Sequence, residues 1–320
     1  AALVVGDQAA IDRTDWDVFR ATGVAHLVSI SGLHITMFAW GAMGMVGRLW
    51  RRSGRLCRVL PAPSAALLGG VWLATAYAVF SGWGVPAQRT CLMLATVALL
   101  RLGGARWPWP VVWMGACALV VVYDPWALLQ SGFWLSFVAV GILFASNSGA
   151  ISAYSTRANA IFRYMIRGLR EQWTITLALT PLTLVLFGQV SLVGLAANVL
   201  AIPWVTLVIT PLALLGVAVP LAWDVAAAAM GGLWAYLQWL AAWPWAAVAV
   251  AVPPTWAAVA GVLGGAVLVV PWPWSLRVLG LPLVLPVLLW RAPLPPAGHF
   301  ELLAADVGQG TSVLVRTAHH

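Results

Sequence analysis

The chain has no lysine among its 320 residues, so all 17 of its permanently positive residues are arginine. A Walker A loop needs a lysine on the nucleotide phosphates, and a Schiff-base enzyme needs one as its nucleophile. Both kinds of site are therefore excluded from this chain. Any ATP-driven step must belong to another protein.

Cysteine is almost as scarce, since only Cys57, Cys91 and Cys117 occur, in a basic loop or inside hydrophobic runs. Their wide separation indicates neither a disulfide framework nor a zinc site. The N-terminal residues also lack the basic stretch and short apolar core of a signal peptide. We therefore expect this sequence to be part of a longer chain.

Charged residues make up only 8% of the chain, whereas 62% is hydrophobic and the mean hydropathy is +0.92. A soluble domain could not bury so much apolar surface, but a bundle of spanning helices exposes it to lipid without penalty. The composition therefore predicts an all-α polytopic membrane protein. We expect about ten transmembrane or re-entrant helices, because ten apolar runs approach the length of about 20 residues that a span needs. These runs cover residues 30–47, 64–81, 86–103, 108–122, 127–145, 172–188, 192–219, 225–243, 255–271 and 276–290.

The seventh run is too long for one straight helix and contains Asn198, Pro203 and Pro211. Proline removes a backbone hydrogen bond and clashes with the preceding turn. Two interpretations stay open: a broken or re-entrant helix that lines a cavity, and a simple kink between packed neighbours.

Arginine gathers in every second loop, and the loops between have none. The positive-inside rule therefore places the basic loops in the cytoplasm and both terminal segments outside it. Topology alone explains the first basic loop, although that loop is basic enough to bind nucleic acid or anionic lipid. Residues 157–170 are predicted to form an amphipathic helix on the inner face. The arginines of the first basic loop are Arg48, Arg51, Arg52, Arg55 and Arg58.

Two shorter segments flank the membrane region. Residues 7–25 mix aspartates with apolar residues, which is typical of an amphipathic surface helix, with Asp12 or Thr14 as its N-cap. Beyond Pro293, FELLAADVGQGTSVLVR alternates in the manner of two short strands around a DVGQG turn. We divide the chain into an amphipathic extracytoplasmic segment (1–25), a membrane-embedded region (26–292) and a short C-terminal β segment (293–320), the expected opening of a further domain.

Residues 26–35, HLVSISGLHI, place two serines, a glycine and two histidines at the start of the first run. Such groups are costly in lipid and need either protein cover or a watery path. On one continuous helix the two histidines would share a face, unless the glycine interrupts it. The polar residues of this segment either line the outer mouth of a conduit or bond neighbouring helices: His26, Ser29, Ser31, Gly32 and His34.

Four segments resemble, in the same order, the ComEC-type DNA internalisation proteins of bacterial natural transformation. They are HLVSISGLHI, VPAQRT (Val85 to Thr90), DPWALLQSGFWLSFVAV (Asp124 to Val140) and LTPLTLVLFGQVSLVGLAANVLAIPWV (Leu179 to Val205). The tail LLAADVGQGTSVLVRTAHH resembles the first strands of the metallo-β-lactamase-like domain that follows the membrane region in this family. That domain's HxHxDH cluster does not occur here, so we assign no metal to this chain and expect any divalent cation only in the missing part of that domain.

The resemblance implies a channel in the bacterial inner membrane that passes single-stranded DNA into the cytoplasm during competence, without catalysis or a cofactor in this chain. It implies as partners membrane lipids, a periplasmic DNA-binding receptor and a cytosolic ATPase or helicase motor. Two rivals stay open: a transporter for a small solute or a lipid-linked substrate, and a membrane anchor for a metal-dependent hydrolase. Small-residue faces suit packing within one chain or a homodimer: Gly41, Gly44 and Gly47, and Gly261 with Gly265.

The other polar residues of the shared segments have two interpretations each. Arg89, beside Gln88, either contacts a DNA phosphate at the entrance or extends its guanidinium to the membrane surface. Asp124 is expected to cap the helix of the fifth run, in which Gln130 either lines the DNA path or bonds a packed helix. Lining and packing are also both open for two residues that flank the seventh run, Gln189 and Asn198.

Overall fold

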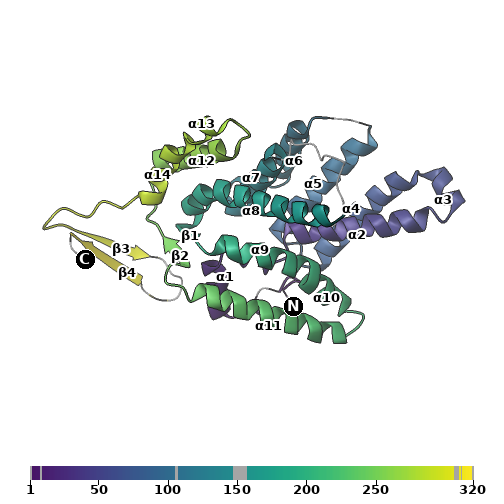
Figure 1. The fold of residues 1–320 in the computed structure, drawn as a ribbon, viewed down its shortest axis with the longest axis horizontal. Coiled ribbons are helices and arrows are strands. Elements are labelled where there is room, and N and C mark those ends of the chain that lie inside the picture. Colours follow the sequence, from purple (N-terminus) through teal and green to yellow (C-terminus); the bar gives the residue numbers. More distant parts are fainter. Residues whose placement is uncertain are drawn as a thin grey trace.

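The computed structural model (Figure 1) describes residues 2–7, 9–104, 107–146, 157–305, 310 and 312–318, with only the backbone described for 146 and 157–165. The elements are α1 (Arg13–Ala21), η1 (Ala25–Leu27), α2 (Gly32–Trp50), α3 (Gly54–Val59), α4 (Ala62–Phe80), α5 (Val85–Leu102), α6 (Trp109–Tyr123), η2 (Pro125–Leu129), α7 (Ser131–Ser146), α8 (Arg157–Phe187), β1 (Gln189–Ser191), α9 (Gly194–Trp204), η3 (Val205–Ile209), α10 (Thr210–Leu215), α11 (Leu221–Ala241), β2 (Ala247–Ala249), α12 (Thr255–Val269), α13 (Trp274–Arg277), α14 (Gly280–Leu289), β3 (Phe300–Ala305) and β4 (Ser312–Thr317).

The helices are those of a membrane protein, because four in the described residues are long and apolar enough to cross a bilayer: Ala25–Trp50, Ala62–Phe80, Val85–Leu102 and Gly194–Leu215. Each of the ten apolar runs contains helix, so the positions of the helices are as the sequence predicts. Several of the remaining apolar helices have only 10–17 residues. The predicted number of ten spans is therefore not confirmed.

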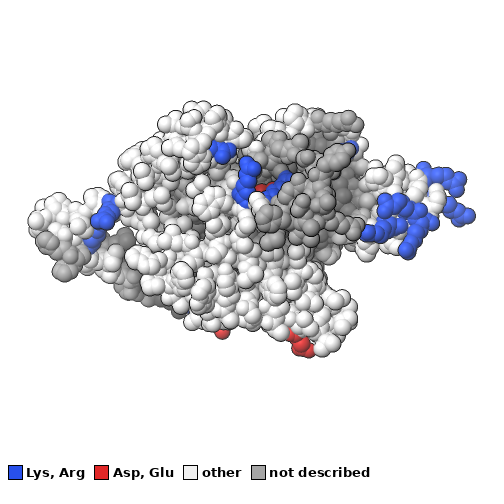
Figure 2. Space-filling view, in the orientation of Figure 1, with Lys and Arg blue, Asp and Glu red and all other residues white. Residues whose placement is uncertain are grey.

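α2 and α4 lie side by side and carry the short helix α3 at their tip (Figure 1). The turn is closed by the indole of Trp50, whose Nε1 donates to the carbonyl of Leu60 at 3.0 Å. The five arginines of the first basic loop are all exposed on this tip, where Figure 2 shows a dense cationic patch at one end of the molecule. We call this patch the arginine tip: Arg48, Arg51, Arg52, Arg55 and Arg58.

The course of α8 contradicts the prediction of a separate amphipathic helix over residues 157–170. The arginine-rich stretch from residue 157 is the first half of a single 31-residue helix and does not form a separate helix lying flat on the membrane. No proline occurs in this helix before Pro181, and an ion pair of 2.9 Å between Arg167 Nε and Glu171 Oε1 links successive turns. The helix therefore continues without a break from the basic stretch into the sixth apolar run.

The seventh run is continuous helix rather than a broken or re-entrant one. α9 leads directly into the π-helical turn η3 and then into α10, so the chain stays helical from Gly194 to Leu215. A proline ring clashes with the carbonyl four residues earlier, and for Pro211 that carbonyl lies in the wider turn of η3, which gives it room. Pro203 lies inside α9, and the span continues through both prolines.

The small-residue face of α12 is used within the chain. A Cβ on Gly264 would lie 2.7 Å from the carbonyl oxygen of Gly280 in α14, and one on Gly265 would lie 3.0 Å from that of Ala178 in α8. Only glycine permits this close packing of three helices. A Cβ on Gly41 of α2 would meet no atom within 4 Å, so a role for that face in a homodimer stays a prediction.

The C-terminal segment forms the predicted hairpin. β3 pairs antiparallel with β4 in a register that places Phe300 opposite Thr317. Residues 306–309, which include most of the DVGQG turn, lie outside the described residues. Both strands are largely exposed, and their assignment to a metallo-β-lactamase-like domain stays a prediction.

Candidate functional site

The serine and the second histidine of HLVSISGLHI build the start of α2. Ser31 is the N-cap, with extended backbone angles, and its Oγ accepts a hydrogen bond from the backbone N–H of His34 at 3.5 Å. In return the backbone N–H of Ser31 donates to His34 Nδ1 at 3.2 Å. This reciprocal capping box satisfies two backbone groups that a helix start otherwise leaves unpaired. The motif is thus a structural device as well as a polar patch.

Replacing Ser31 with alanine is expected to lower the free energy of unfolding by about 1 kcal/mol, because the side-chain half of the cap is lost. Equilibrium unfolding of the full-length protein in detergent measures the change. Ser53 offers a matched control, since it caps the six-residue α3 on the exposed arginine tip. Ser53→Ala should cost less, and an equal or larger loss there would contradict the importance of the Ser31 cap.

The two histidines lie on different elements, so they do not share the face of one helix. His26 lies exposed in the short turn η1, whereas His34 lies in α2 and is only 1% exposed. The break occurs because the chain is extended at Ser31, ahead of Gly32. Ser29, between them, donates from Oγ to the carbonyl of His26 at 3.5 Å.

The ring of His34 leaves one polar atom without a partner. Nδ1 accepts from Ser31, so the neutral ring carries its proton on Nε2. Nε2 is buried and has no hydrogen-bond partner among the described residues. A buried N–H without an acceptor is costly, so this atom is available to a water molecule or a ligand.

The start of α5, which is the VPAQRT segment, packs against the start of α2. A Cβ on Gly32 would lie 2.6 Å from Thr90 Oγ1, so only glycine allows the two helices to approach so closely. Gln88 braces the loop ahead of α5, donating from Nε2 to the carbonyl of Trp83 at 2.7 Å. Trp83 needs such support because its φ is +50°, a conformation that a bulky residue rarely adopts.

The side chain of Arg89 is buried among the helices, which favours a contact inside the bundle over extension of its guanidinium to the membrane surface. The residue is 5% exposed, and its Nε donates to the carbonyl of Val85 at 3.3 Å. The guanidinium lies against the start of α7, where a Cβ on Gly132 would be 2.9 Å from Nη2. VPAQRT and DPWALLQSG therefore meet through an arginine and a glycine.

Asp124 caps the turn η2 and not the helix of the fifth run. Its Oδ1 accepts from the backbone N–H of Trp126 at 3.0 Å, and its Oδ2 accepts from Gln130 Nε2 at 3.5 Å. The prediction of a capping role was right, but its helix was wrong, because η2 separates Asp124 from α7. Gln130 is half-buried and immediately precedes α7.

The fourth shared segment reaches the same region through Ser191. Its Oγ donates to the carbonyl of Ala21 at 2.7 Å, and a Cβ on Gly23 would lie 3.2 Å from its Cβ. This contact joins β1 to the turn that leads into HLVSISGLHI. Gln189, at the start of β1, is exposed and pairs with Ala249 of β2.

The seventh run holds polar residues that the sequence analysis missed. Thr206 and Thr210 are 7% and 1% exposed, and their Oγ1 atoms are buried with no partner in the described part of the chain. The Oδ1 of Asn198 is likewise buried and has no partner among the described residues. The sequence did carry a signal for these two threonines. They lie four residues apart in an apolar run, between Pro203 and Pro211, and this spacing places them on one helix face.

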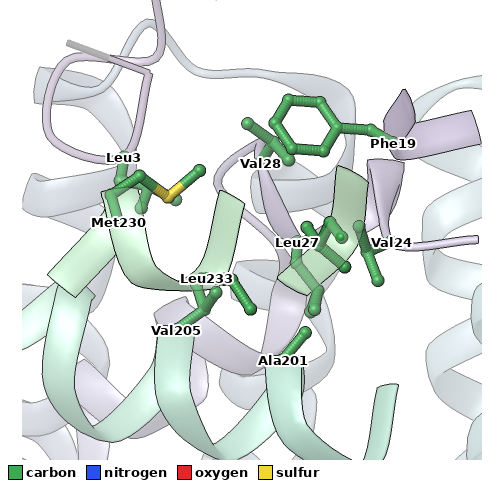
Figure 3. A pocket seen from close by; sticks show the side chains of 10 residues that line it. Leu3, Phe19, Val24, Leu27, Val28, Ala201, Val205, Met230 and Leu233 are labelled. Atoms are coloured by element: carbon green, nitrogen blue, oxygen red, sulfur yellow. The ribbon is translucent and has the colours of Figure 1, made fainter. Parts of the chain in front are cut away.

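One cavity lies beneath the N-terminal helix. It encloses roughly 280 Å³, counting space open to its surroundings, and is lined by ten side chains from α1, η1, α9, η3 and α11 and from the N-terminal segment. Figure 3 shows that all ten are apolar, including Phe19, Leu27, Val205 and Met230. Such a lining offers no partner to a phosphate group or a metal ion. Among the described residues, no three His, Cys, Asp or Glu side chains gather to hold a metal.

The first three shared segments thus meet at the starts of α2, α5 and α7, and the fourth contacts the turn that leads into the first. A family model described as "Competence protein" matches residues 3–275. The chain belongs to the competence-protein family. Its ComEC-type character was predicted from the same four segments, and this prediction is confirmed.

Relatives in this competence family are similar along the chain. It is 37% identical to competence protein ComA of Neisseria gonorrhoeae over 99% of its length, which is 44% of that protein. It is 30% identical to uncharacterized protein YcaI of Escherichia coli over 98% of its own length, which is 42% of that protein. It is 31% identical to recombination protein 2 of Haemophilus influenzae over 68% of its own length, which is 28% of that protein. The chain therefore spans less than half of these relatives. No solved structure matches it.

Proposed function

We propose that this chain forms the membrane channel through which single-stranded DNA enters the cytoplasm during natural transformation. The observation that carries the proposal is the meeting of the starts of α2, α5 and α7 in one polar cluster: Ser31, Gly32, His34, Gln88, Arg89 and Gln130. Polar groups at the end of a membrane-spanning bundle are costly unless they line a path or are covered by protein. The names of the Neisseria and Bacillus subtilis relatives, "Competence protein ComA" and "ComE operon protein 3", support a role in competence.

The channel would lie in the bacterial inner membrane with about ten spans and both terminal segments outside the cytoplasm. α2 alone, with 19 residues, is about 28 Å long at 1.5 Å per residue, close to the thickness of the hydrocarbon core. The polar cluster begins this helix and the arginine tip follows its end. By the positive-inside rule the cluster faces the periplasm and the tip faces the cytoplasm.

The partners in this proposal follow from what the chain lacks. Without a lysine it has no Walker A loop to drive transport, so a cytosolic ATPase or helicase would pull the strand. A periplasmic DNA-binding receptor would deliver it. The arginine tip is an exposed surface that either the emerging strand or the motor could contact, and the chain itself would hold no cofactor and catalyse no reaction.

A second candidate is a transporter for a small solute or a lipid-linked substrate. Thr206, Thr210 and Asn198 favour it, because each has a buried polar atom with no partner in the described part of the chain, and all three lie along one span with a π-helical turn. Irregular helices in transporters often mark a substrate site near the middle of the membrane. The threonines would then bind the substrate rather than border a path.

Labelled donor DNA distinguishes the proposals in competent cells. Cells that lack the full-length protein are expected to hold the label outside the inner membrane, and the restored protein should move it into the cytoplasm as single strands. Normal entry of DNA without the protein would exclude the channel. Entry that depends only on a hydrolase domain supplied without residues 26–292 would identify the bundle as an anchor.

A further inference from the structure

Arg89 is a buried cation that has no paired anion among the residues the structure describes. Its single hydrogen bond within the described chain runs from Nε to the carbonyl of Val85, in its own helix, and Nη1 is buried with no partner. The ion pairs of the described residues all involve other arginines. A buried charge is tolerated when it is paired and hydrogen-bonded, so this guanidinium lacks the anion that its position demands.

The guanidinium also faces a second positive feature. It lies on the first turn of the 16-residue helix α7, with Nη2 and Nη1 at 2.9 and 3.5 Å from the position of a Cβ on Gly132. The first backbone N–H groups of a helix have no partner inside it, and they carry the positive end of the helix dipole. Two positive groups placed so close together repel each other. An anion held between them would turn that repulsion into attraction.

Asp124 is the acidic group that acts on Arg89, and it does so only through space. Its two oxygens accept from Trp126 and Gln130, so it is committed to capping η2. A nearby carboxylate that does not pair with the arginine lowers the affinity of the site for an added anion. Such a site holds a passing anion briefly and then releases it.

We propose that Arg89 and the first turn of α7 bind one phosphate group of the DNA strand, and that Asp124 keeps this contact weak enough for the strand to move on. The proposal rests on the proposed function, since it names the contact that the channel makes with its cargo. The planar guanidinium offers two parallel N–H groups to a phosphodiester, and the Ser131 and Gly132 end of α7 is partly exposed above it.

The test uses the full-length protein in nanodiscs of neutral lipid and a fluorescent single-stranded oligonucleotide. Arg89→Gln should weaken binding about tenfold or more, and Arg89→Lys should weaken it less, because a point charge replaces the fork. Asp124→Asn should tighten binding several-fold and slow the entry of DNA in cells, since asparagine still caps η2. Arg20→Gln, which removes an exposed arginine of α1, should change binding less than twofold.

Three outcomes overturn the proposal. One is unchanged binding in an Arg89→Gln protein that retains its unfolding temperature, and another is weaker binding in Asp124→Asn. The third is an effect of Arg89 that appears only with anionic lipid in the nanodisc, which would assign the phosphate to a lipid headgroup. An oligonucleotide with a neutral methylphosphonate backbone should bind weakly and independently of Arg89. If the unaltered protein binds no DNA at all, the proposed function fails as well.

Discussion

Replacing Gly32 with valine is expected to abolish DNA entry and to reduce the amount of folded protein in the membrane. The added Cβ would lie 2.6 Å from Thr90 Oγ1, and valine brings two further methyl groups. Thr90 cannot turn away freely, because its Oγ1 donates to the carbonyl of Pro86 at 2.9 Å. α2 cannot shift either without uncovering Ile35, which is fully buried. Overpacking of this kind costs about 1–3 kcal/mol, and here it also separates two segments of the polar cluster.

Gly41→Val is the matched control, because a Cβ at this position of the same helix meets no atom within 4 Å. It should leave protein level and DNA entry near normal, as measured by immunoblot and by labelled donor DNA. The smaller change Gly32→Ala adds only the Cβ that would lie 2.6 Å from Thr90 Oγ1. Thr90→Ala removes that oxygen and should partly rescue Gly32→Ala. Equal behaviour of Gly32→Val and Gly41→Val would show that the approach of α2 to α5 does not matter.

The helices could be predicted from the sequence because apolar runs and proline positions are local signals. The runs located every span-like helix, and alternation located the C-terminal hairpin. Local signals misjudged the continuity of α8. Arginine spacing indicated a separate surface helix where α8 is continuous. The prolines of the seventh run left a break and a kink both open, and the chain stays helical there through η3.

The contacts of the candidate site could not be predicted, because they join residues far apart in the chain. Nothing near Gly32 in the sequence indicates Thr90, and nothing near Arg89 indicates Gly132. Tertiary packing alone decides whether an arginine near a helix end is exposed or buried. The cap formed by Ser31 and His34 is local, but its histidine takes the place in which a capping box usually has a glutamate or glutamine.

A photoreactive residue at position 130 is expected to form adducts with DNA that is entering the cell. Gln130 is half-buried beside the first turn of α7. Within the described residues its side-chain amide makes one long hydrogen bond, 3.5 Å to Asp124 Oδ2, so replacement should leave the fold intact. The control is position 40, because Trp40 lies on the same helix as Gly32 and is 73% exposed, facing away from the packed helices. Lipid, rather than DNA, should surround that side chain.

This cross-linking experiment tests most directly whether the polar cluster at the starts of α2, α5 and α7 borders the path of the strand. It uses competent cells that produce the full-length protein with the photoreactive residue and receive labelled donor DNA. Illumination during uptake should give protein–DNA adducts at position 130 and almost none at position 40, while both proteins still admit DNA. Normal DNA entry with no adduct at position 130, or with equal adducts at the two positions, would contradict the account.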